Sequence, residues 1–192
     1  MAVNMQTESE SHPLSPTIEG IATTFRITGW IDFWLQLALV VVCSFTLLFA
    51  ISGRNFSTET TSGIGIGIFW AVCGLLSLCF SAFLAFRYTR IAKGLHNPKT
   101  DLRPKKADTI QLLRLGVIVG LVGILLFLLG AGATLGVLVA KSVSQPPGVA
   151  ITDPNRIVRA LDVFVAVANV NGIAAHFVGT VSAIFLLERI HR

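Results

Sequence analysis

Polar residues recur at intervals of seven inside a long apolar stretch near the end of the chain. Asp162, Asn169 and His176 follow this spacing, and Asn171 lies beside it. Because seven residues make about two helical turns, the spacing places the three side chains on one face of a helix. A neutral imidazole can bind a transition metal, and amide and carboxylate oxygens can bind a cation. The face therefore predicts a path for a cation or a proton, with His176 as the candidate metal ligand.

The same face also fits a purely structural role. Polar side chains of membrane helices hydrogen bond to neighbouring helices and fix their packing, each contributing about 0.6 kcal/mol. Metal sites usually recruit several histidines, cysteines or carboxylates, and this stretch holds a single histidine. The pattern is therefore consistent both with a path for a cation or proton and with a face that packs against other helices.

A second polar pair opens the first apolar stretch. Asp32 and Gln36 are one helical turn apart, and Trp30 precedes them. Since tryptophan is enriched at the membrane interface, we expect Asp32 near that level, hydrated or paired with Arg26. The sharper alternative is that Asp32 and Gln36 gate the passage of an ion.

Four apolar runs must position these side chains. They cover residues 29–51, 63–86, 112–140 and 163–187. Each is long enough to cross a hydrocarbon layer of about 30 Å, which needs roughly 20 helical residues. Because lipid offers the backbone no hydrogen-bond partner, each run must be a helix. The sequence therefore predicts an all-α, integral membrane four-helix bundle.

Composition excludes several classes of protein. The chain has 192 residues, a mean hydropathy of +0.75 and only 13% charged residues, which does not suit a soluble domain. The net charge of +5 reflects basic residues beside membrane helices, so nucleic acid is not expected as a partner. No nucleophile–base pair, carboxylate dyad or metal cluster stands out, and we do not expect an enzyme.

The chain divides into two parts by polarity. Residues 1–27 are polar and predict a flexible N-terminal tail, and residues 28–192 predict a four-span membrane domain. The tail lacks the features of a secretory signal or an Arg-rich transit peptide. We therefore expect the mature protein to keep the whole chain.

Positive charge is distributed unequally between the loops. With four helices, both termini and the middle loop share one side, which carries eleven lysines and arginines against four on the other. Cytoplasmic segments carry the excess of positive charge in membrane proteins. The sequence thus predicts that both termini face the cytoplasm.

Glycines are regularly spaced in the second and third runs. Small residues allow membrane helices to approach closely, and a seven-residue or alternating four-and-three spacing keeps them on one face. Gly132 and Gly136 form a further pair on a neighbouring face of the third run. The predicted helix-packing glycines are Gly67, Gly74, Gly116, Gly120, Gly123 and Gly130.

Several blocks in order resemble one membrane protein family. The blocks are residues 28–37, 85–92, 136–141, 161–164 and 174–179. They resemble the cyanobacterial and plastid family that includes a chloroplast inner-envelope protein, described both as a subunit of the protein-import translocon and as an iron permease. The resemblance covers nearly all of the chain beyond the tail.

The resemblance implies a role in iron handling or in protein translocation. It favours a transport component for iron or another divalent cation, acting as a homo-oligomer in a lipid bilayer. The alternative is a structural subunit of a translocon or of a photosynthetic membrane complex. No cofactor is certain, and iron is expected as a transported ion. Lacking a transit peptide, the chain is expected in a cyanobacterial plasma or thylakoid membrane.

Overall fold

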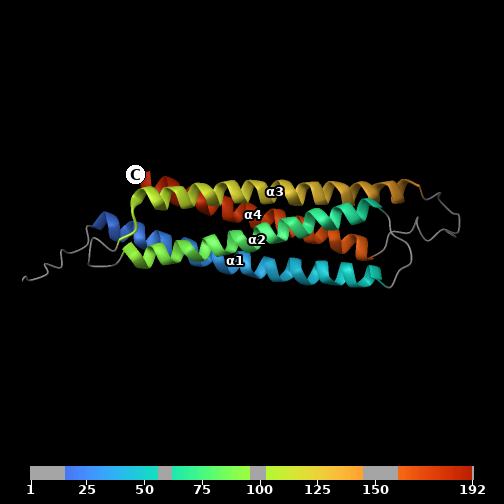
Figure 1. The fold of residues 1–192 in the computed structure, drawn as a ribbon, viewed down its shortest axis with the longest axis horizontal. Coiled ribbons are helices and arrows are strands. Elements are labelled where there is room, and N and C mark those ends of the chain that lie inside the picture. Colours follow the sequence, from blue (N-terminus) through green and yellow to red (C-terminus); the bar gives the residue numbers. More distant parts are fainter. Residues whose placement is uncertain (1–15, 56–61, 96–102, 145–159, 192) are drawn as a thin grey trace, which may run out of the picture.

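The computed structural model describes residues 16–55, 62–95, 103–144 and 160–191. These residues form four helices: α1 (Pro16–Asn55), α2 (Ser62–Leu95), α3 (Lys106–Val143) and α4 (Ala160–His191). They run lengthwise beside one another in alternating directions (Figure 1). At the termini end of the bundle α1 begins and α4 ends, and at the opposite, distal end α3 ends and α4 begins.

Each helix extends beyond its predicted apolar run. α1 begins at Pro16, so residues 16–27, assigned above to the tail, are helical, whereas residues 1–15 lie outside the described part. Proline is well suited to the first turn of a helix, since its missing N–H has no partner there anyway. Hydropathy marks only the segment that lipid demands, and backbone hydrogen bonding continues into the polar flanks.

The four helices pack as a closed square. α1 lies against α2 and α4, and α3 lies against the same two helices. Across the diagonal, α2 and α4 approach each other more closely than α1 and α3 do. Helices that follow one another in the chain are antiparallel neighbours, which gives the up-and-down arrangement.

The outside of the bundle is more apolar than a soluble protein tolerates. Phe49, Leu76 and Phe177 are 66%, 67% and 60% exposed, and many other large apolar side chains share that outer surface. All four helices are long and apolar enough to cross a membrane. The predicted all-α, four-helix integral membrane bundle is therefore confirmed.

Candidate functional site

Polar side chains are concentrated inside the bundle rather than on its lipid-facing surface. Three of them belong to α4, where Asp162, Asn169 and His176 are 6%, 0% and 0% exposed. Two more belong to α1, where Asp32 and Gln36 are each 1% exposed. Asn171 is only partly buried, so it stands apart from these five. Asp162, Asn169, His176, Gln36 and Asp32 together are the polar column.

His176 lies at the middle of the column. Its Nε2 atom is 3.5 Å from the carbonyl oxygen of Gly74 on α2, and its Nδ1 atom has no hydrogen-bond partner in the described structure. The ring of Phe127 lies beside it, with 5.9 Å between ring centroids. Gly123 of α3 provides the room, because a Cβ atom at that position would collide with the imidazole.

Asn169 occupies the next level toward the distal end. Its Nδ2 atom donates to the carbonyl oxygen of Val165 at 2.9 Å, while its Oδ1 atom is buried without a donor among the described residues. Gly130 of α3 faces that oxygen. Thr134 completes the level by donating to the carbonyl oxygen of Gly130 at 2.8 Å. Asn169 of α4 and Thr134 of α3 thus both supply hydrogen-bonding groups where these two helices meet.

Asp32 and Gln36 lie in the interior and not at a hydrated interface. The Gln36 Nε2 atom donates to Asp32 Oδ1 at 2.8 Å. Arg26 is exposed, and within the described ranges no ion pair joins it to Asp32. The expectation of hydration or pairing with Arg26 is therefore wrong. The reason is that Asp32 and Gln36 lie on the face of α1 that packs into the bundle, whereas Ile31 and Trp34 on neighbouring faces are exposed.

Further along α4, two residues lie beside the polar pair of α1, so the polar residues of the two helices form one line. Gly179 of α4 faces the Gln36 side-chain amide and the hydroxyl of Ser81. One turn further, Ser182 lies beside the Asp32 carboxylate. Twenty residues separate Asp162 from Ser182, a rise of about 30 Å, which equals the thickness of the hydrocarbon layer. The polar column therefore runs the length of a membrane crossing.

A buried ion pair closes the distal end of the column. Lys141 Nζ lies 2.8 Å from Asp162 Oδ2, and the two side chains are 9% and 8% exposed. This ion pair was not among the predictions made from the sequence. A signal was available, because Lys141 is in the last turn of α3 and Asp162 in the first turn of α4, and consecutive antiparallel helices bring such turns together.

The six glycines predicted to pack helices all face another helix across a close contact. Gly67 lies against Thr134, Gly116 against the Tyr88 hydroxyl, and Gly120 against Thr180. By contrast, Gly132 and Gly136 have nothing within 4 Å, which leaves their surface of α3 open. The remaining three are Gly74, Gly123 and Gly130, which lie against Phe127, His176 and Asn169.

Phe127 crosses the column between two of its levels. Its ring lies against Gly74 of α2 and Gly172 of α4, where an added Cβ atom would collide with it. Gly172 falls between Asn169 and His176 along α4. The aromatic ring therefore separates the amide level from the imidazole level.

The metal-binding capacity of the column is limited. No group of three or more His, Cys, Asp or Glu side chains comes together in the described part of the chain. His176 thus has no surrounding set of protein ligands of the kind found in a resident metal site.

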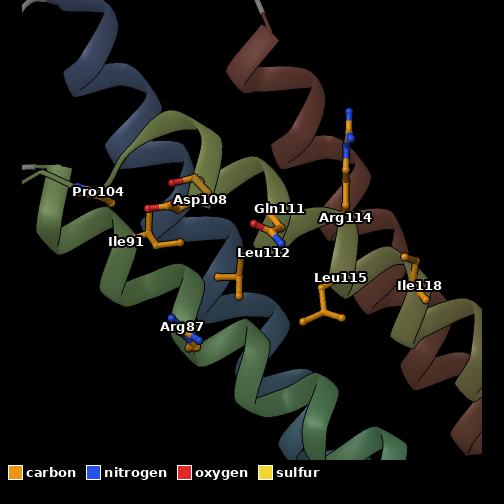
Figure 2. A pocket seen from close by; sticks show the side chains of 10 residues that line it. Arg87, Ile91, Pro104, Asp108, Gln111, Leu112, Arg114, Leu115 and Ile118 are labelled. Carbon is orange, nitrogen blue, oxygen red and sulfur yellow. The ribbon is translucent and has the colours of Figure 1, made fainter.

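A pocket of 640 Å³ lies apart from the column, at the termini end between α2 and α3. Arg87 and Asp108 line it, and the side chains of Leu112 and Leu115 point into it (Figure 2). Arg114 projects away from α2 in the same view. The pocket is an amphipathic surface hollow, and none of the described residues that line it belongs to the polar column.

Comparison with known proteins identifies the family. The family described as "Protein of unknown function (DUF3611)" matches residues 15–191. Among curated proteins, Protein TIC 21, chloroplastic, from Arabidopsis thaliana is 33% identical over 181 residues. That match covers 90% of this chain and 58% of the relative, so the chain spans little more than half of the relative's length. No solved structure matches the chain.

The family match includes all four helices and the whole polar column. The similarity to TIC 21 agrees with the plastid resemblance expected from the sequence blocks, so that prediction is confirmed. The chain belongs to the membrane protein family described as "Protein of unknown function (DUF3611)".

Proposed function

We propose that this protein is a membrane-transport component that moves iron or another divalent cation along the polar column. The observation that carries the proposal is the line of buried polar groups over about 30 Å, a full membrane thickness. Asn169 and His176 each keep a buried atom without a hydrogen-bond partner among the described residues. Polar groups at that depth are expensive in lipid and are retained mainly where they pair or line an ion pathway.

The ligand chemistry along the column fits a divalent transition metal in passage. Imidazole nitrogen binds iron, and carboxylate and amide oxygens bind the same ion more weakly. The levels at Asn169 and His176 are about 10 Å apart along α4, and beyond them Asp162 is already paired with Lys141 at the distal end. Weak sites in series permit an ion to enter and also to leave, which a conducting path requires.

Iron uptake into proteoliposomes tests the proposal. His176→Ala is compared with Leu78→Ala, which also opens a cavity beside the apolar core but removes no polar atom. We expect His176→Ala to slow uptake about tenfold or more, equivalent to ~1.4 kcal/mol, and Leu78→Ala to leave it near the wild-type rate. Equal rates in both variants, with helical content preserved, would remove His176 from the path.

The proposal includes a topology and a location. Both termini face the cytoplasm, and the protein resides in a cyanobacterial plasma or thylakoid membrane. Basic residues on α2 and α3 support the orientation, because Arg87, Arg90, Lys93 and Lys106 all lie at the termini end. Protease digestion of sealed membranes, with an epitope at the N-terminus, reports the side directly.

A second candidate function is a structural subunit of a protein translocon or of a photosynthetic membrane complex. The open surface at Gly132 and Gly136 favours it, since a small-residue face lets another helix pack closely in lipid. The same surface can instead join copies of this chain into a homo-oligomer.

Mild detergent extraction followed by native mass spectrometry separates the two candidates. A large stoichiometric partner that is lost in the double variant Gly132→Leu, Gly136→Leu supports the structural subunit. An assembly of this chain alone that the same variant breaks supports the oligomeric transporter. The matched control is Leu125→Ala, which alters another exposed apolar position on the same helix.

A further inference from the structure

The termini-end part of the column contains two acceptors that no described donor satisfies. They are Asp32 Oδ2 and Gln36 Oε1, and both side chains are 1% exposed. The other atoms of the pair are already engaged, because Gln36 Nε2 donates to Asp32 Oδ1. A buried oxygen without a donor has lost its hydration, and no hydrogen bond offsets that desolvation cost. The pair is therefore incomplete as the protein atoms stand.

The charge of Asp32 makes this incompleteness more severe. An ionised carboxylate inside a membrane bundle must be paired or neutralised. The groups facing it are neutral hydroxyls, with Tyr88 from α2 and Ser182 from α4. Arg26 on its own helix is exposed, and Arg189 of α4 lies near Gly20, twelve residues before Asp32. α3 packs on the far side of α2 and α4.

We propose that Asp32 and Gln36 form a binding site for one positive charge, held as an alkali-metal ion such as Na⁺ or as a proton. The side chains that can bind a cation here offer oxygen atoms as ligands. Ser81 and Ser182 can add their hydroxyl oxygens to those of the Asp32 carboxylate and the Gln36 amide. Oxygen ligands select hard cations.

Charge balance favours a monovalent occupant over a divalent one. One positive charge cancels the single carboxylate and leaves a neutral group inside the bundle. A divalent cation would leave one net positive charge at the pair, so it is held there less favourably than a monovalent one. The site thus differs in chemistry from the imidazole level, and it stands whether or not the protein carries iron.

Thermal unfolding of the full chain in detergent micelles tests the site. The midpoint Tm is measured for the wild type, Asp32→Asn and the control Asp108→Asn, whose carboxylate is exposed at the start of α3. Each is measured in NaCl and in choline chloride of equal ionic strength, and then in choline chloride across a range of pH. A ligand that binds only the folded state raises Tm, because it adds RT ln(1 + c/Kd) to the free energy of unfolding, where c is the free ligand concentration.

We expect Asp32→Asn to mimic the filled site, since an amide is neutral and its nitrogen can donate to Gln36 Oε1. A rise in Tm with Na⁺ in the wild type and in Asp108→Asn, but not in Asp32→Asn, identifies an alkali-metal ion. No effect of Na⁺, together with a Tm that falls with rising pH in all but Asp32→Asn, identifies a proton.

An equal response of wild type and Asp32→Asn to both Na⁺ and pH would overturn the proposal. If Asp32→Asn does not yield folded protein, Gln36→Met replaces it, because methionine keeps the bulk of the side chain and removes the carbonyl ligand. It should weaken whichever response the wild type shows, and an unchanged response counts against the site. None of these measurements uses iron, so they are independent of the uptake assay.

Discussion

Two aspartates lie buried near opposite ends of the bundle, and their surroundings differ. At the distal end, Asp162 meets the ammonium group of Lys141 at 2.8 Å. Toward the termini end, Asp32 meets only neutral groups, the Gln36 amide at 2.8 Å and the hydroxyl of Ser182, and no cation pairs with it in the described structure. The two residues have the same chemistry and similar burial, so the difference lies in what neutralises them.

Asp162 has a partner that is part of the protein, whereas the partner that we propose for Asp32 can exchange with the surroundings. A lysine tethered to α3 stays with Asp162 as long as the bundle is folded. A bound ion or proton at Asp32 responds to the concentration around it. We therefore expect the Lys141–Asp162 pair to have a structural role, and we call this ion pair the clasp. We expect the Asp32–Gln36 pair to behave as a binding site.

The largest expected effect comes from breaking the clasp on one side. Lys141→Met removes the ammonium group that lies 2.8 Å from the buried Asp162 carboxylate, which should cost about 3–5 kcal/mol of the free energy of unfolding. Unfolding in mixed detergent micelles measures the loss. A change of less than about 1 kcal/mol would show that Asp162 is already neutralised by other means, and the contrast between the two aspartates would disappear.

A smaller effect is expected between the two aspartates, where the glycines hold α3 against α4. Gly123→Ala drives a methyl group into the His176 ring and should cost about 1–3 kcal/mol. Gly132→Ala is the matched control on the same helix, since nothing lies within 4 Å of that position. Its free energy of unfolding should stay within about 0.5 kcal/mol of the wild type. Equal losses in both variants would contradict the close packing around the imidazole.

Substitution in the Asp32–Gln36 pair is expected to lower the free energy of unfolding about as much as Gly123→Ala, or slightly less. Gln36→Met removes the donor to Asp32 Oδ1 and leaves a second buried oxygen unsatisfied, at about 1–3 kcal/mol. The loss should grow in buffer that supplies the neutralising cation or proton, because the variant binds that ligand more weakly and gains less stability from it. A loss that is the same in all buffers would place Asp32 in the same class as Asp162.

The smallest effect is expected when both members of the clasp are replaced together. The double variant Lys141→Met, Asp162→Leu removes two charges and keeps similar volume, so its stability should match or exceed that of the wild type. Comparison with the single Lys141→Met variant gives the coupling energy of the pair. Additive losses in the double variant would mean that the two side chains do not act as a unit.

Much of the architecture could be predicted from the sequence. The apolar runs specify four membrane helices because lipid leaves the backbone no alternative, and these helices are observed. The seven-residue spacing of Asn169 and His176 placed them on one face, and both are fully buried. Spacing suffices in these cases, since the period of an α-helix fixes which residues share a face.

Other features depend on distances that spacing does not encode. Lys141 and Asp162 are twenty-one residues apart and belong to different helices, so their contact follows from how α3 and α4 pack. The burial of Asp32 was mispredicted because hydropathy locates the apolar run but does not show which face of α1 packs against its neighbours. Ser182 beside Asp32 and Gly179 beside Gln36 arise from the relative register of α1 and α4, which is a tertiary property.

Phe127 has a consequence for movement within the bundle. Its ring is bounded by a glycine of α2 on one side and a glycine of α4 on the other, and its own backbone belongs to α3. Such a ring has no room to change rotamer while those helices keep their spacing. Any event that joins the two levels on either side of it must shift whole helices, and rearrangements of that size take microseconds to milliseconds instead of the nanoseconds of a side-chain flip.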